Sequence, residues 1–231
     1  MKRCLVIGVA VLLASPSALA QVDRYAERAP TLRFVAGPTT GAVRGNPSPS
    51  TPQGGGENNN VYTWGVAVGG ERRVLDHLWL GVSGGWSTWT QGSGIDAGYL
   101  YRRFDVGVTP RLEVLRLSAK VMMTTFDIAV PVGVTFPFVT VPQRRAFEEN
   151  VDSGSGWYVG GSASMTMVFR LGRAPSRMVI GYRLEASAMR HASHRRTTFT
   201  PTDPAQAPIV QNTDIVDNEV PTYTAAFVFG F

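Results

Sequence analysis

Polar and apolar residues alternate at the end of the chain. Tyr223, Ala225, Phe227, Phe229 and Phe231 occupy every second position, and smaller residues lie between them. Successive side chains of a β-strand point to opposite faces, so a period of two indicates a strand with two different environments. The last nine residues are therefore predicted to form a strand with one strongly apolar face.

The same alternation recurs through most of the chain. In residues 178–189, for example, Leu184 and Ala186 fall on the face opposite Arg183 and Glu185. A helical period of 3.6 fits none of these segments well. Eight strands are predicted, at residues 25–37, 61–72, 78–89, 98–112, 115–126, 157–171, 178–189 and 223–231, with a bulge near Arg102 and Arg103.

The predicted connections are of two kinds. Residues 73–77, 113–114 and 172–176 form short turns, whereas 38–60, 90–97, 129–155 and 190–217 form mostly long loops. Short turns at one end and long extracellular loops at the other are typical of transmembrane barrels, and each strand has about the ~9–11 residues needed to cross hydrocarbon. The predicted fold is all-β: an eight-stranded antiparallel up-and-down transmembrane β-barrel.

The C-terminal strand resembles the assembly signal of Gram-negative outer-membrane β-barrels, which ends on a phenylalanine. Its residues here are Tyr223, Phe227, Phe229 and Phe231. The overall arrangement is similar to the membrane-anchor barrel of the OmpA family. The resemblance implies an outer-membrane location and the barrel-assembly machinery as a partner. We expect no peptidoglycan-binding domain after Phe231.

The first twenty residues have the layout of a secretory signal peptide. Basic Lys2 and Arg3 precede an apolar stretch, and Ala18-Leu19-Ala20 provides the small residues of a cleavage site before Gln21. We therefore expect a signal peptide at residues 1–20 and a barrel at residues 21–231. The single cysteine, Cys4, lies in the predicted signal, so no disulfide is expected in the mature chain.

Charged residues fall on the predicted inward faces of the strands. A narrow lumen dehydrates these groups, and a buried charge is costly unless it is paired. We expect Arg103 to pair with Asp105, and Arg183 with Glu185, in a network that crosses the barrel. This network would fix the strand register as a polar plug or, alternatively, line a gated solute path. The predicted lumen residues are Arg33, Glu71, Arg103, Asp105, Lys120, Arg170, Arg183 and Glu185.

Aromatic residues are predicted to form two girdles around an apolar band, as expected for a barrel anchored at both membrane interfaces. The outer girdle consists of Tyr62, Trp64, Trp86, Tyr99, Trp157 and Tyr223, and the inner one of Trp79, Phe169, Phe229 and Phe231. The apolar segment 129–142 either extends strands above the membrane as a hairpin, where it would contact a partner or lipid, or folds against the other loops and caps the barrel.

The amino-acid composition limits the classes of partner that the protein can be expected to bind. Only 17% of the residues are charged, 44% are hydrophobic, and the net charge of +5 is not gathered into a basic block. Nucleic-acid binding is therefore not expected. Outer-membrane lipid is the expected partner, and Arg190, Arg195 and Arg196 are predicted to contact lipopolysaccharide phosphates, which guanidinium groups bind in a bidentate manner.

One pair of residues is a candidate catalytic pair. His191 and Ser193 could act as base and nucleophile, and lipid A deacylases carry a similar pair with a glutamate that orients the histidine. Here the third member is missing, since Asp203 lies between prolines and Glu219 is distant. We predict that the protein is not an enzyme and has neither a cofactor nor a metal site.

The sequence favours a structural or surface-interaction role through the extracellular loops, with side chains filling the lumen. The surface ligand itself is not indicated. Passage of a small or hydrophobic solute, as in OmpW-like eight-stranded barrels, is the alternative. Hydrolysis of lipid A is a second, less favoured alternative function.

Overall fold

A computed structural model describes residues 30–44, 61–91, 99–119, 121–140, 147–171, 178–201 and 205–231. Within these ranges every regular element is a strand, and no helix capable of crossing a membrane is found. The strands are β1 (Leu32–Arg44), β2 (Val61–Leu75), β3 (Leu78–Gln91), β4 (Tyr99–Ser118), β5 (Met122–Ala129), β6 (Val132–Thr140), β7 (Phe147–Arg170), β8 (Val179–Pro201) and β9 (Ile209–Gly230).

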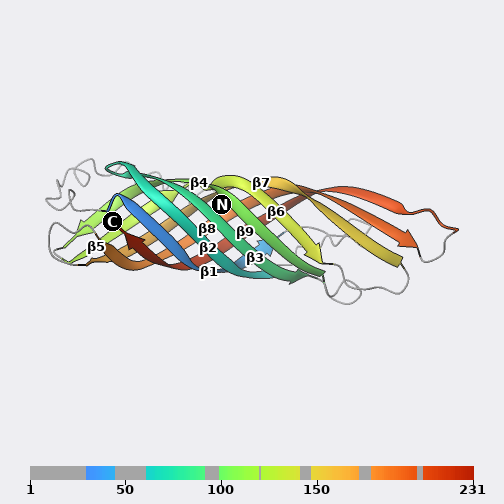
Figure 1. Cartoon of the computed structure of the whole chain (residues 1–231), viewed down its shortest axis with the longest axis horizontal. Coiled ribbons are helices and arrows are strands. Elements are labelled where there is room, and N and C mark those ends of the chain that lie inside the picture. Colours follow the sequence, from blue (N-terminus) through green and yellow to red (C-terminus); the bar gives the residue numbers. More distant parts are fainter. Residues whose placement is uncertain are drawn as a thin grey trace, which may run out of the picture.

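The sheet closes on itself as a barrel. Consecutive strands pair antiparallel, except β5 with β6, and β1 also pairs with β9 through partners such as Phe34 and Phe229. Both β5 and β6 pair with β4 and β7, at different heights. Since Pro131 interrupts the ladder between them, β5 and β6 are two parts of one wall strand. The ring therefore has eight strands, as predicted, and its tilted strands are visible in Figure 1.

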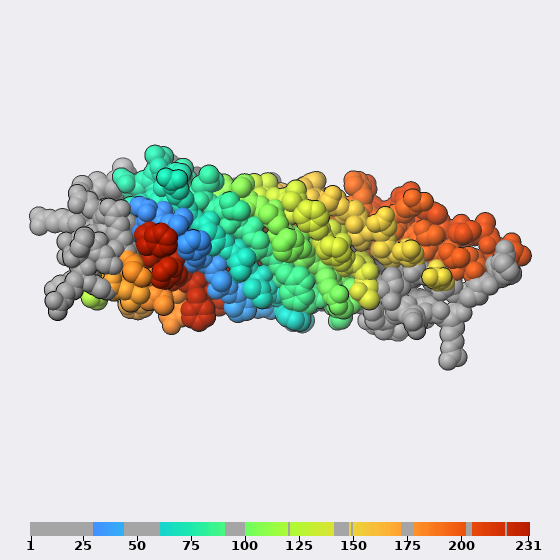
Figure 2. Space-filling model, viewed as in Figure 1, coloured from blue at the N-terminus to red at the C-terminus, as the bar shows by residue number. Residues whose placement is uncertain are grey.

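The outside of the barrel is apolar and the inside is polar. Phe227 is 64% exposed and Leu184 lies beside it on the outer face, whereas Arg183 is only 2% exposed. Large exposed hydrophobic side chains lie on all nine strands, and Figure 2 shows one face of the long cylinder that these strands form. This inversion is expected where lipid, and not water, surrounds the wall. The predicted assignment of faces in residues 178–189 and in the C-terminal strand is confirmed.

Several predicted strand limits were wrong. The turn expected at 113–114 does not exist, because β4 continues to Ser118 and the chain reverses between Ala119 and Met122. A register shift between Glu113 and Leu115 changes which positions face inward. The change of phase at this bulge was therefore mistaken for a turn between two strands. The beginning of the first predicted strand lies outside the described residues, and β1 extends to Arg44.

The predicted loops contain much of the wall. Residues 129–155 contain β6 and the start of β7. Residues 190–217 contain the end of β8 and the start of β9. The apolar segment 132–140 is thus a barrel strand, paired with β4.

Three strands project beyond the others. Among the described strands, residues 147–155 of β7 pair with β8 only. Residues 209–217 of β9 likewise pair with β8 only. We call this projection, residues 147–155, 194–201 and 209–217, the blade. It is the narrow extension of β7, β8 and β9 at one end of Figure 1.

Apolar side chains close the lumen near each end. Met123, Val168, Val179 and Val228, with Val35 against them, fill the end that carries the C-terminus. Toward the blade, Val43, Trp89 and Tyr101 form a second group, with Val61 and Val139 packed on it.

The candidate site in the charged lumen

Three layers of ion pairs cross the lumen. The first layer, nearest the C-terminus, is centred on Glu113, which is fully buried. Arg33 contacts it at 3.5 Å, Arg116 forms a second ion pair with it, and the indole N–H of Trp79 donates to it at 3.3 Å. The Arg33 guanidinium also lies 3.4 Å from the centre of the Trp79 ring. Such stacking stabilises a cation that has been removed from water.

Glu71 is the centre of the second layer. Arg183 donates to both of its carboxylate oxygens, at 2.6 and 2.7 Å, and Arg111 donates to it at 3.0 Å. Arg111 also donates to Ser164 at 2.6 Å and to Glu185 at 2.8 Å. This layer links β2, β4, β7 and β8. Bidentate contacts of this kind fix geometry and add energy in a low-dielectric interior.

The third layer is centred on Arg103. Its Nε donates to Asp105 at 3.1 Å, and Nη2 donates to Glu219 on β9. Nε2 of His191 lies 3.3 Å from the same Asp105 carboxylate, and the His191 ring stacks on Tyr158 with centroids 5.4 Å apart. Tyr158 can occupy this place because it lies over a pair of glycines, Gly107 and Gly133, where any Cβ would clash with its ring.

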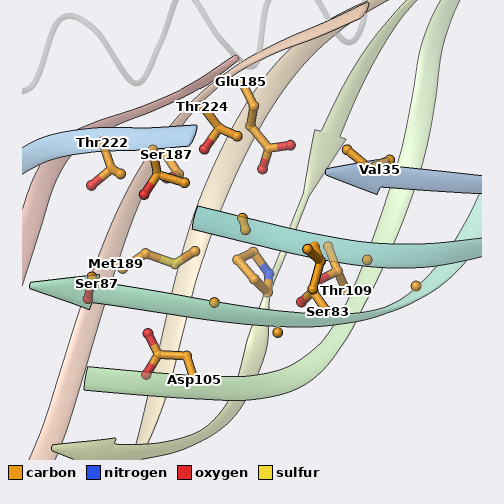
Figure 3. Close-up of a pocket in the computed structure, with 18 of the residues that line it drawn as sticks. Val35, Ser83, Ser87, Asp105, Thr109, Glu185, Ser187, Met189, Thr222 and Thr224 are labelled. Atoms are coloured by element: carbon orange, nitrogen blue, oxygen red, sulfur yellow. The ribbon is translucent and has the colours of Figure 1, made fainter. Parts of the chain in front are cut away.

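A cavity of about 170 Å³ lies between the second and third layers. Its wall includes Glu71 and Arg183 from one layer and Asp105 and His191 from the other. Figure 3 shows Ser87, Asp105, Met189 and Thr222 arranged around it on different strands. We call this cavity the chamber.

The structure places six of the eight predicted lumen residues in the interior layers: Arg33, Glu71, Arg103, Asp105, Arg183 and Glu185. Arg170 also faces inward and donates to Ser118 at 3.0 Å. Lys120 lies outside the described residues. Of the two expected pairs, Arg103 and Asp105 are in contact.

The expected pairing of Arg183 with Glu185 is wrong. Arg183 forms its ion pair with Glu71, and Glu185 forms its ion pair with Arg111. Both side chains project from the same face of β8, and their length allows them to reach partners across the lumen. The pairing therefore depends on the positions of β2 and β4, which a single strand's pattern does not contain.

Sequence reasoning missed five ionisable participants in the layers, Arg111, Glu113, Arg116, His191 and Glu219, and also the buried Asp127. The alternation of Arg103, Asp105, Thr109, Arg111 and Glu113 was a usable signal, because all five have the same parity. The turn predicted at 113–114 hid it. Asp127, which accepts from Thr125 at 3.2 Å, was missed because the next strand was predicted to end at residue 126, whereas β5 continues to Ala129. Glu219 fell in a predicted loop.

The predicted surface arginines separate into two groups. Arg190 and Arg196 are exposed on the outer face of β8. Arg195 is only 3% exposed and points inward, so its predicted contact with lipopolysaccharide is wrong. Because β8 continues as a strand through this region, alternate residues face opposite sides.

The candidate catalytic pair is not assembled in the described residues. His191 makes its side-chain hydrogen bond with Asp105, and no hydrogen bond joins it to Ser193. Among the described residues there is likewise no cluster of metal-ligating side chains.

Most of the residues predicted for the aromatic girdles face outward. Tyr62, Trp64, Trp157 and Tyr223 are exposed on the outer wall, together with the C-terminal residues Phe227, Phe229 and Phe231. Trp79 was assigned to the inner girdle incorrectly, since it is 0% exposed and lies in the lumen. The side chain of Tyr99 lies outside the described part of the structure.

A closed eight-stranded wall, apolar outside and ion-paired inside, defines the class: this is a small outer-membrane β-barrel protein. No protein-family model and no curated protein sequence matches the chain. Among solved structures, OprG from Pseudomonas aeruginosa is similar with a TM-score of 0.51 at 11% identity, covering 88% of this chain and 96% of that one. This likeness shows the shared barrel fold.

Two other solved barrels match more distantly. AlkL, solved in DMPC bilayers, has a TM-score of 0.43 at 11% identity, with 88% of this chain and 92% of that chain covered. Ail, the attachment invasion locus protein of Yersinia pestis, has a TM-score of 0.36 at 8% identity, with coverages of 88% and 99%.

Proposed function

We propose that this protein is a non-conducting outer-membrane barrel that acts at the cell surface through its blade. The observation that carries the proposal is the combination of a lumen crossed by three layers of ion pairs with a wall that extends beyond the barrel on three strands. The layers join opposite walls, as Arg183 of β8 joins Glu71 of β2. An ion entering the lumen would have to displace these contacts.

The blade has the chemistry of a contact surface. On its outer face His194 bonds Asp214 at 2.6 Å and Arg196 is exposed. At its tip Ile209 is 58% exposed, and Val210 beside it is exposed as well. Exposed apolar residues rimmed by polar ones are typical of protein-binding surfaces. The blade is therefore the part of the described molecule best suited to a surface partner.

Lipopolysaccharide is the second partner that we propose. Arg190 projects outward from β8 two residues beyond Ala188, which is also on the outer wall, and Arg196 projects from the same face higher up. At these heights a guanidinium can bind the phosphates of the outer leaflet. Replacing both with glutamine should weaken retention of lipopolysaccharide by the purified barrel. Arg72 is an exposed arginine of β2 at the other end of the barrel, beside the turn at 76–77. Arg72→Gln is therefore the matched control and should leave retention unchanged.

Conductance tests the closed lumen. The refolded barrel is inserted in planar bilayers beside a general porin as the positive control. We expect no sustained single-channel current from the barrel at voltages where the porin conducts. Sustained open currents would overturn the proposal and favour the alternative of solute passage.

A further inference from the structure

The chamber contains polar atoms that have no partner. Among the described residues, five buried polar atoms without a hydrogen bond belong to side chains that line it: Ser87 Oγ, Arg103 Nη1, Asp105 Oδ1, His191 Nδ1 and Thr222 Oγ1. Arg103, His191 and Thr222 are each more than nine-tenths buried. Buried polar groups of folded proteins are nearly always satisfied, so a cluster around one cavity indicates an occupant.

The hydrogen-bonding roles of these atoms are mixed. Arg103 Nη1 can only donate and Asp105 Oδ1 can only accept. Because the Asp105 carboxylate accepts from His191 Nε2, the other ring nitrogen of a neutral His191 is also an acceptor. The two hydroxyls can do either. A complementary occupant must therefore both donate and accept at several points.

The charges around the chamber favour a neutral occupant over an anion. Each guanidinium in its wall already has a carboxylate: Arg103 has Asp105 and Glu219, Arg111 has Glu71 and Glu185, and Arg183 has Glu71. An incoming anion would find no guanidinium of its own, beside four carboxylates, and would remain an uncompensated buried charge, which is strongly unfavourable.

We propose that the chamber is a binding site for a small neutral polyol. Hydroxyl groups donate and accept equally well, which suits the mixed set of unpartnered atoms. The volume of about 170 Å³ exceeds by roughly tenfold the ~10–15 Å³ that one water centre needs, so a four- or five-carbon molecule fits. Its carbon faces would contact the Met189 and Val35 side chains, which also line the chamber. This site goes beyond the proposed surface role and does not depend on it.

Methyl NMR of the methionines tests the site with built-in controls. The barrel is labelled at the methionine methyls, refolded in micelles in the presence of erythritol, and compared across a concentration series. Met189 lines the chamber, whereas Met123 lies in the apolar cluster nearest the C-terminus and Met165 faces outward. We expect a saturable shift of the Met189 resonance alone.

Removal of two hydroxyls supplies the second readout. The Ser87→Ala/Thr222→Val double variant keeps the shape of the wall and should weaken erythritol binding by about tenfold, since each lost hydrogen bond counts for about 0.5–1.5 kcal/mol. Ser153→Ala removes a buried unpartnered hydroxyl outside the chamber and should have no effect.

Three results would overturn the proposal. The Met189 resonance could stay fixed, which would mean that water alone fills the chamber. All methionine resonances could drift together, which would mark a solvent effect. Succinate, an ion of similar size, could bind more tightly than erythritol. Conductance measurements are unaffected by any of these results, so the two proposals fail separately.

Discussion

At the scale of single residues, Glu71 determines the middle of the barrel. It accepts from two guanidinium groups, and both of these arginines are almost completely buried. Replacing Glu71 with glutamine keeps the shape but removes the charge that both require. A buried pair that loses one partner costs about 3–5 kcal/mol, so Glu71→Gln should lower the free energy of unfolding by roughly 3 kcal/mol. Urea unfolding, followed by loss of the fast-migrating folded band on gels, measures it.

Glu148→Gln is the matched control, because Glu148 is exposed on β7. Exposed substitutions usually change stability by less than about 0.5 kcal/mol. Equal urea midpoints for the two variants would show that the layer around Glu71 contributes no stability.

Tryptophan position gives a second prediction at this scale. Trp157 faces outward and is exposed, whereas Trp79 is enclosed in the lumen beside Arg33. In barrels that keep one tryptophan each, with the others changed to phenylalanine, lipids brominated on their acyl chains should quench Trp157 strongly and Trp79 weakly. Strong quenching of Trp79 would place it on the outer wall, as the sequence pattern alone had suggested.

These residues also mark how far sequence reasoning extends. Alternation predicted which side of the wall Arg183 and Glu185 occupy, because that depends on one strand only. It did not predict that Arg183 binds Glu71, because this contact joins residues 112 positions apart. Partner choice depends on strand register around the ring. Neither composition nor periodicity carries that information.

At the scale of elements, β4 shows why strand limits were harder to predict than strands. A bulge between Glu113 and Leu115 shifts the register by one position. In the sequence this shift interrupts the alternation of polar and apolar residues in the same way as a turn does. The true reversal near Val121 lacks glycine and proline, the residues that normally mark a turn. The strand ends at 147–155 and 190–217 were mistaken for loops for a related reason, since polar strands above a membrane lose the apolar face that makes alternation visible.

The blade should be dispensable for folding. Its strands pair only with one another, so removing it leaves the ring intact. His194 lies opposite Asp214, and a variant that joins these two residues through an Asn-Gly turn removes the parts of the blade from β8 and β9 beyond them and keeps the register of the two strands. We expect this variant to retain the heat-modifiable migration of the full barrel and its urea midpoint to within about 1 kcal/mol.

A second truncation serves as the control for that measurement. Joining Ala186 to Tyr223, which are also opposite each other, cuts into the wall itself and should abolish the folded band. Loss of the folded band in both variants would show that the blade is part of the folding unit and not an addition to it.

At the scale of the whole molecule, closure joins the two ends of the described chain. The carbonyl of Phe231 accepts from the backbone N–H groups of Thr31 and Leu32, at 2.9 and 3.0 Å, and its own N–H donates to Leu32. Its side chain, however, is exposed on the outer wall next to Phe34. The backbone of Phe231 therefore closes the ring, while its side chain adds little to the interior.

This division separates stability from assembly. If the phenylalanine side chain serves as a signal read by the assembly machinery, Phe231→Ala should reduce the folded band in cell membranes several-fold, yet shift the in vitro urea midpoint by less than about 1 kcal/mol. Phe34→Ala removes the neighbouring exposed ring from the same wall and is the matched control, with a small effect in both assays. Equal losses for the two variants in cells would mean that Phe231 acts through ring packing, and the C-terminal strand would then carry no separate signal.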